Sequence, residues 1–150
     1  GAIYQHLNQT FFFAHYPEFR DIALTAFEQQ LGLVIDDCRK RDIRLLVAFL
    51  PTMLQVEYET DGEHLDKVLE TLGLTTADLE TTPLLTDRLM SWLKTQGVQV
   101  IDLAPAFKEA DDELFWRRDY HLGVAGHRLL AEQLSLALSG GDDQSTGDLP

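Results

Sequence analysis

Asp119 and His121 are the two residues of this sequence whose types and spacing best fit acid–base chemistry. A carboxylate close to a histidine can accept a hydrogen bond from one imidazole nitrogen, which fixes the tautomer and leaves the other nitrogen available to take a proton from a nucleophile. The pair follows a short apolar run that ends at Trp116, and it precedes a helix that begins at a glycine-flanked turn. We therefore expect His121 to lie in a loop facing a cleft, with Asp119 as its partner.

The stretch from Leu114 to Ala131 resembles the last sequence block of the SGNH (GDSL-type) esterases and lipases. In that block, an Asp and a His precede a small turn, a Gly-His pair and an apolar helix. The matching residues here are Asp119, His121, Gly126, His127, Ala131 and Leu134. One residue separates Asp119 from His121 where two are commoner, and Gly123 stands where a polar helix cap is frequent. The resemblance is strongest between Val98 and Leu138 and extends back to Ile43.

The resemblance implies a serine nucleophile that attacks an ester or other acyl carbonyl, with His121 as base and then acid, and an oxyanion hole made by a glycine and an asparagine. The chain contains neither Gly-Asp-Ser nor Gly-x-Asn-Asp, and its only asparagine is Asn8. We therefore expect this chain to be the C-terminal part of a hydrolase that acts on ester or O-acetyl bonds of a lipid or carbohydrate. By itself the chain is expected to be inactive, and no cofactor is expected. Acyl transfer to a sugar hydroxyl, as in related O-acetyltransferases, stays open, and so does a non-catalytic binding module.

The composition indicates one globular domain with a strong negative charge. The chain has 150 residues, 45% of them hydrophobic, and 25 acidic against 12 basic residues give a net charge of −13. Nucleic acids and anionic membranes attract concentrated basic patches, so both are disfavoured as partners. No apolar run reaches the 18 residues of a membrane span. A single cysteine, Cys38, excludes an internal disulfide and leaves the compartment undecided.

Two apolar runs, Ile43–Leu50 and Val98–Leu103, alternate with segments of helical periodicity. Each is short enough for a strand, and the alternation of helices and strands favours a parallel sheet with helices on its faces. We predict that the two runs are adjacent parallel strands in a three-layer α/β/α domain, flavodoxin-like and SGNH-hydrolase-like, over residues 1–138. Residues 139–150 are rich in Gly, Ser and Asp and are predicted to form a disordered acidic tail.

The loop after the first predicted strand supplies the candidate substrate-binding residues. It begins at Pro51 and leaves the carboxyl end of the strand, where open parallel sheets bind their ligands. Thr52, Gln55 and Tyr58, together with Glu57, are therefore candidates to line a site, although ordinary polar loop residues have the same composition.

Several other side chains are expected to be structural. One apolar stripe of the helix over residues 21–41 is predicted to be buried, and it comprises Leu24, Phe27, Leu31, Val34, Ile35 and Cys38. Helical spacing places His127 on the packed side of the last helix, in contrast to His121. The run Phe11–Phe13 is interpreted as an aromatic plug on the domain or as a wall of an acyl pocket.

No metal site is predicted, because His6 and His15 have no partner at ligand spacing. A zinc site made of Asp119, His121 and His127 would lack a fourth ligand. Two strands make a small sheet with an apolar edge, so self-association, or pairing with a missing N-terminal half, is expected.

Overall fold

A computed structural model describes residues 7–56, 62–116 and 121–139, and its centre is a pair of parallel strands. Strand β1 (Leu46–Phe49) pairs with β2 (Gln99–Asp102), with Leu46 opposite Gln99 and Phe49 opposite Asp102. The predicted adjacency and parallel orientation are confirmed, and each strand is shorter than the apolar run that predicted it.

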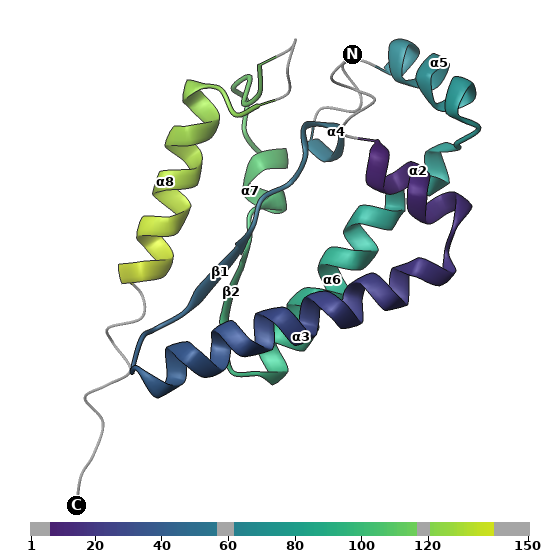
Figure 1. The fold of residues 1–150 in the computed structure, drawn as a ribbon. Helices are drawn as coiled ribbons and strands as arrows, with labels where there is room; N and C mark the ends of the chain where they lie inside the picture. The colour runs from purple at the N-terminus through teal and green to yellow at the C-terminus, as the bar shows by residue number, and fades with distance from the viewer. Residues whose placement is uncertain (1–6, 57–61, 117–120, 140–150) are drawn as a thin grey trace, which may run out of the picture.

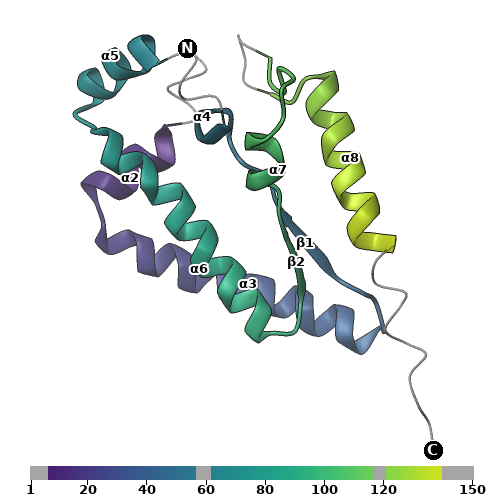
Figure 2. The same ribbon diagram turned by 180° about the vertical axis from the view of Figure 1, so that it is seen from behind.

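Helices make up the rest of the regular structure in the described ranges. They are α2 (Asn8–His15), α3 (Glu18–Lys40), α4 (Met53–Val56), α5 (Gly62–Leu72), the 3-10 helix η2 (Thr76–Glu80), α6 (Thr81–Thr95), α7 (Ala104–Lys108) and α8 (Val124–Ser139). Figures 1 and 2 show α8 on one side of the strands, and α3 and α6 on the other. This mostly helical structure with a two-stranded parallel sheet is compatible with the α/β class, and the three-layer sandwich stays a prediction.

Two apolar clusters hold these elements together. Ile35 of α3 and Leu93 of α6 pack with Val98 and the half-buried Val47 and Val100 on one side of the strands. A larger cluster forms around Leu103, Phe107, Leu114 and Phe115, with Leu129 and Leu130 of α8 packed against it. The helices that contain Leu31 (α3) and Trp92 (α6) therefore lie against one side of the sheet.

The end of α8 is attached to the start of both strands. Arg44, just before β1, donates from Nη2 to the carbonyl of Leu138 at 3.2 Å, and Gln99 of β2 donates from Nε2 to the carbonyl of Ala137 at 3.1 Å. The last carbonyls of a helix have no partner within the helix, so these side chains satisfy groups that would otherwise depend on water. The two bonds fix α8 along the direction of the strands.

The prediction for the buried stripe of α3 is wrong at two positions. Leu24 and Ile35 are buried, but Phe27 and Val34 are 49% and 48% exposed. The two strands and α6 cover a narrow side of the helix, so apolar residues at the border of that side stay in solvent. Cys38 is half-buried, at the edge of the packed side.

The aromatic run of α2 is not the plug that the sequence predicts. Phe11 and Phe12 are 37% and 43% exposed, and only Phe13 of the three is half-buried. Helix α2 is anchored instead by Leu7 and Thr10, which are 1% and 4% exposed. In an α-helix, three consecutive residues point to three different sides, so one packed face cannot take all three rings.

The C-terminal helix α8 ends at Ser139, so the first residue of the predicted tail 139–150 is helical, and residues 140–150 lie outside the described residues. Among the helices that the structure describes, none combines the length and the apolarity that crossing a bilayer requires.

Candidate functional site

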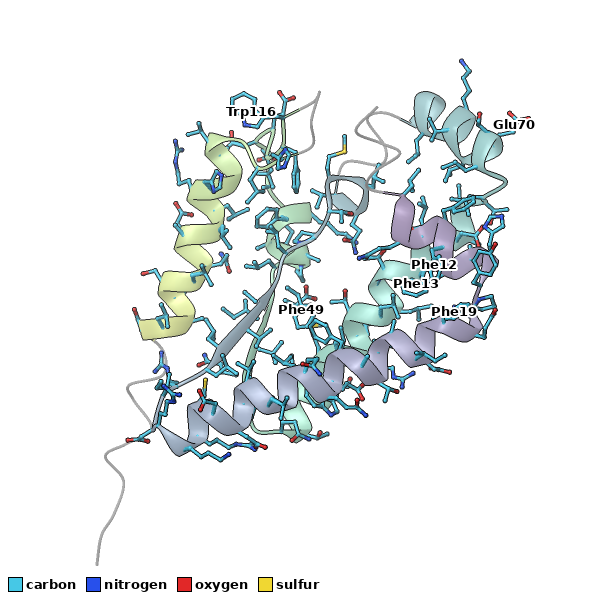
Figure 3. All side chains as sticks on the ribbon, viewed as in Figure 1. Phe12, Phe13, Phe19, Phe49, Glu70 and Trp116 are labelled. Carbon is cyan, nitrogen blue, oxygen red and sulfur yellow. The ribbon has the colours of Figure 1, made fainter. Side chains whose placement is uncertain are left out.

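His121 is attached by its backbone to the segment that precedes it. Phe115 and Leu122 form an isolated antiparallel bridge, and the amide of Trp116 donates to the carbonyl of His121 at 2.8 Å. The amide of Gly123 donates to the carbonyl of Leu114 at 2.8 Å. We call residues 114–116 together with 121–126 the His121 clamp. Figure 3 shows Trp116 beside the first turn of α8, at the end of the sheet where α4 and α7 begin.

Gly126 lets the first turn of α8 approach this segment. A Cβ atom built on Gly126 would collide with the carbonyl oxygen of Leu114 and would lie 2.8 Å from Cδ2 of Leu122. A Cβ atom on Gly123 would lie 3.4 Å from the same carbonyl oxygen, which is a van der Waals contact. Close backbone approach therefore explains the glycine at position 126.

The clamp leaves His121 exposed while its neighbours are buried. Leu114 and Phe115 are 2% and 4% exposed, and the rings of Phe115 and Phe107 lie 6.1 Å apart between centroids. The side chain of His121 is on the surface. Asp119, its predicted partner, lies outside the described residues, so the hydrogen bond between them stays a prediction.

The prediction that His127 lies on the packed side of α8 is wrong, because His127 is exposed. The buried side of the helix instead carries Gly126, with Ala125, Leu129 and Leu130 packed against the core. The contact of Gly126 with Leu114 fixes the rotation of the helix, and residue 127 then points away from the core. Helical spacing alone does not predict this rotation of α8.

A cavity of about 370 Å³ lies next to the carboxyl end of β1. Its lining comes from α2, the loop after β1, η2, the start of α6 and the end of α7. The lining residues are Leu7, Thr10, Thr52, Leu54, Gln55, Thr76, Leu79, Glu80, Thr82, Pro83 and Lys108. Four threonines, a glutamine and two oppositely charged residues line it together with apolar residues, so the cavity suits a small ligand with several hydroxyl groups.

Two of the three predicted substrate-binding residues line this cavity. Gln55 accepts through Oε1 from the backbone amide of Thr52 at 2.8 Å and from the Thr52 hydroxyl at 3.2 Å. These bonds close the turn between β1 and α4 and fix the orientation of the Gln55 amide. Tyr58 and Glu57 lie outside the described residues. His121 does not belong to the cavity lining, so the structure does not bring it together with Thr52 and Gln55.

The sequence analysis missed most of the cavity. Thr10, Glu80 and Lys108 line it, but each comes from a different element. Lys108 ends the short helix that follows β2, and position after a strand is the one signal that pointed toward it. Thr10 and Glu80 carried no signal, because their neighbours in the cavity are distant in sequence.

One wall of the cavity is stabilised by a charged cap. The Asp78 carboxylate accepts from the amide of Thr75 at 2.7 Å and from its hydroxyl at 2.8 Å, at the start of η2. The two bonds to Thr75, with a smaller effect from the charge of His15, hold the pKa of Asp78 below its ordinary value against a small opposing effect of burial. Thr76, Leu79 and Glu80 of the same helix line the cavity.

The described serines do not sit in a nucleophile turn. Ser91 lies within α6, and Ser135 and Ser139 lie within α8, where the Ser139 hydroxyl donates to the carbonyl of Ser135 at 2.8 Å. Within the part of the chain that the structure covers, no group of three or more His, Cys, Asp or Glu side chains is arranged to hold a metal ion.

The fold and the candidate residues define the class of protein. Thr52 and Lys108 follow the carboxyl ends of two parallel strands, and the glycine-dependent His121 clamp packs at the same end, which is the usual location of ligand sites in open α/β sheets. A sequence model of the SGNH hydrolase-like domain of the acetyltransferase AlgX matches residues 14–148, which are 135 of the 150 residues. The chain therefore belongs to this SGNH hydrolase-like family. No curated protein and no solved structure matches it.

Proposed function

We propose that this domain supports transfer of an acyl group, most simply acetyl, to a hydroxyl group of a carbohydrate, with His121 as the general base. The observation that carries the proposal is the His121 clamp. It holds an exposed histidine by backbone hydrogen bonds at the carboxyl end of the sheet, in a chain whose family description is that of an acetyltransferase. Fold alone does not determine the chemistry, so the site carries this argument.

In the proposed mechanism, a serine hydroxyl attacks the acyl carbonyl of the donor while His121 takes the hydroxyl proton. His121 then gives this proton to the leaving group, and the acyl-enzyme forms. Asp119 orients the imidazole. In the second half, an acceptor hydroxyl attacks the acyl-enzyme while His121 takes its proton; the bond between the acyl group and the serine breaks, and His121 returns the proton to the serine oxygen. The described serines Ser91, Ser135 and Ser139 lie within helices, so the proposal assigns the nucleophile to a serine other than these three.

The cavity around Thr52 and Gln55 is proposed to bind the hydroxyl-rich acceptor. Its threonine hydroxyls and the Gln55 amide supply donors and acceptors, and its apolar residues exclude water. Hydrolysis differs from transfer only in the group that attacks the acyl-enzyme. Because a bound acceptor competes with water for that step, weaker acceptor binding should favour hydrolysis.

The test uses the longer polypeptide that contains the serine block. His121→Ala should lower turnover of an activated ester by about 10⁶-fold, which is typical when the base of such a triad is lost. His127→Ala is the matched control, because His127 is also exposed but lies outside the clamp; it should change turnover less than about twofold. Unchanged turnover in His121→Ala would remove His121 from the mechanism.

Transfer and hydrolysis are separated by their products. With an acetyl donor and a neutral oligosaccharide, mass spectrometry measures acetylated sugar and free acetate. Gln55→Ala should shift the product ratio toward acetate without lowering the rate of acyl-enzyme formation. Acetate as the sole product of the unmodified enzyme, with every acceptor tried, would favour the esterase assignment.

A non-catalytic binding module is the second candidate. The observation in its favour is that none of Ser91, Ser135 and Ser139 lies in a turn near the His121 clamp. The 150-residue chain by itself should therefore not react with a fluorophosphonate probe. Stoichiometric labelling of this chain would show a nucleophile within it, and absence of labelling in the longer polypeptide as well would favour the binding module.

A further inference from the structure

Helix α3 carries a second set of apolar residues outside its packed side. The packed side consists of Leu24 and Ile35 with the half-buried Leu31 and Cys38. Five further apolar residues, which run from the border of the packed side around the helix, are exposed: Phe19 (42%), Ile22 (61%), Phe27 (49%), Leu33 (64%) and Val34 (48%). Ala23 and Ala26, also exposed, lie between them. We call this set the outer α3 stripe.

The stripe continues into an aromatic group at the corner between α2 and α3. The ring of Phe12 lies 5.4 Å from that of Tyr16 and 5.6 Å from that of Phe19, and Tyr16 and Phe19 lie 6.3 Å apart. Phe12 and Tyr16 are 43% and 48% exposed. Figure 3 shows Phe12 and Phe19 at this corner. A contiguous exposed apolar surface of this extent is typical of an interaction site.

We infer that the outer α3 stripe is an interface with a second copy of this chain, formed by antiparallel packing of the two α3 helices. The charges on α3 specify this orientation. Its first turn is acidic, with Glu18 and Asp21, and its last turn is basic, with Arg39 and Lys40. An antiparallel pair places each acidic end beside a basic end, whereas a parallel pair places like charges side by side.

The stripe is also self-complementary under a two-fold axis, as an interface between identical subunits must be. If Ile22 of one copy lies level with Val34 of the other along the helix axis, then Ala23 lies level with Leu33, and the small Ala26 lies level with Gln30 near the two-fold axis. The alanines let the helices approach closely. In this register, Glu18 lies within one turn of Lys40 of the second copy.

The charge pair that distinguishes this arrangement is Glu18 with Lys40. Asp21 already pairs with Arg88 at 2.6 Å, and Arg39 pairs with Asp36 at 3.5 Å within the same chain. A helix of 23 residues is about 34 Å long, which gives a contact at the small end of stable interfaces. The dimer should therefore dissociate with a constant on the order of micromolar.

The first experiment measures the mass of the 150-residue chain by sedimentation equilibrium over a range of concentrations. The chain should form dimers, and the double substitution Ile22→Glu and Leu33→Glu should raise the dissociation constant at least tenfold. Leu136→Glu is the matched control, because Leu136 is 67% exposed on α8, away from the stripe; it should leave dimerisation unchanged. Circular dichroism checks that each variant is folded.

A monomer at all concentrations, or a dimer insensitive to the double substitution, would overturn the proposal. A dimer insensitive to the double substitution would point to the sheet edge as the interface instead.

The second experiment tests the orientation. Glu18→Lys should weaken the dimer, and adding Lys40→Glu to the same chain should restore it. In a Cys38→Ser background, Ile22→Cys mixed with Val34→Cys should form a disulfide-linked dimer under oxidation, and Ile22→Cys alone should not. Cross-linking of Ile22→Cys with itself would show a parallel pair and contradict the antiparallel arrangement.

Discussion

The His121 clamp and the cavity around Thr52 lie at the same end of the sheet but are built in different ways. The clamp is local, because its contacts join residues 114–116 to residues 121–126. The cavity draws its lining from four separate parts of the chain, between Leu7 and Lys108. A local unit depends on backbone geometry within a few residues, whereas the cavity depends on the packing of α2, η2 and α6 against the end of the sheet.

This difference has a consequence for how the two parts respond to change. The clamp contains backbone contacts with no space for an added atom, so small substitutions there should have large effects. The cavity is bordered by side-chain hydrogen bonds at exposed or half-buried positions, so changes there should cost less and act mainly on binding.

The largest effect is expected at Gly126. Gly126→Ala places a Cβ atom against the carbonyl of Leu114, in a buried turn where neither backbone can move freely. We expect the free energy of unfolding to fall by about 2–3 kcal/mol, as for other overpacked sites, measured by urea denaturation. Gly32→Ala is the control: Gly32 lies within α3 with no atom near the added Cβ, and the variant should gain about 0.5–1 kcal/mol. Equal stability of the two variants would contradict the close approach.

An intermediate effect is expected at Gln55. Gln55→Ala removes the acceptor for two donors of Thr52, one of them a backbone amide, in a half-buried turn. The unfolding free energy should fall by about 1–2 kcal/mol, since each such bond contributes about 0.5–1.5 kcal/mol. Gln55→Glu keeps an oxygen that can accept from both donors and should lose less. If Gln55→Ala proved as stable as the parent chain, the turn would not depend on this side chain.

The smallest effect is expected at Asp78, and it depends on pH. Because the pKa of Asp78 is lowered in the folded state by its bonds to Thr75, the carboxylate stabilises the fold above its unfolded pKa of about 3.9, and this contribution disappears as the pH falls through the lower folded value. Asp78→Ala should therefore cost about 1 kcal/mol at pH 7, typical of a lost cap. The difference from the parent chain should shrink toward pH 2–3.

Thermal unfolding followed by circular dichroism at pH 7 and at pH 3 measures the difference in stability between Asp78→Ala and the parent chain. Asp78→Asn, which keeps an acceptor oxygen without the charge, should lie between the parent and Asp78→Ala at pH 7. A cost of Asp78→Ala that is the same at pH 7 and pH 3 would show that the charge of Asp78 has no part in the cap.

The sequence by itself determined the strand pair, the positions of the main helices and the family. Apolar runs that end at Pro51 or after Leu103 are short enough to be strands, and the glycine after α6, Gly97, has a left-handed backbone with φ 67°. The sequence block around Asp119 and His121 was also recognisable, because the contacts that require Gly126 join residues only about twelve positions apart.

Only the tertiary structure decided which sides of the helices are covered. His127 lies in solvent because Gly126 sets the rotation of α8 against Leu114, and Phe27 and Val34 lie in solvent because two strands and α6 cover a narrow side of α3. Helical periodicity predicts that an apolar stripe exists, but the width of the surface that meets the stripe is set by elements distant in sequence. The cavity has the same origin, because Thr10, Glu80 and Lys108 become neighbours only when their helices pack at the end of the sheet.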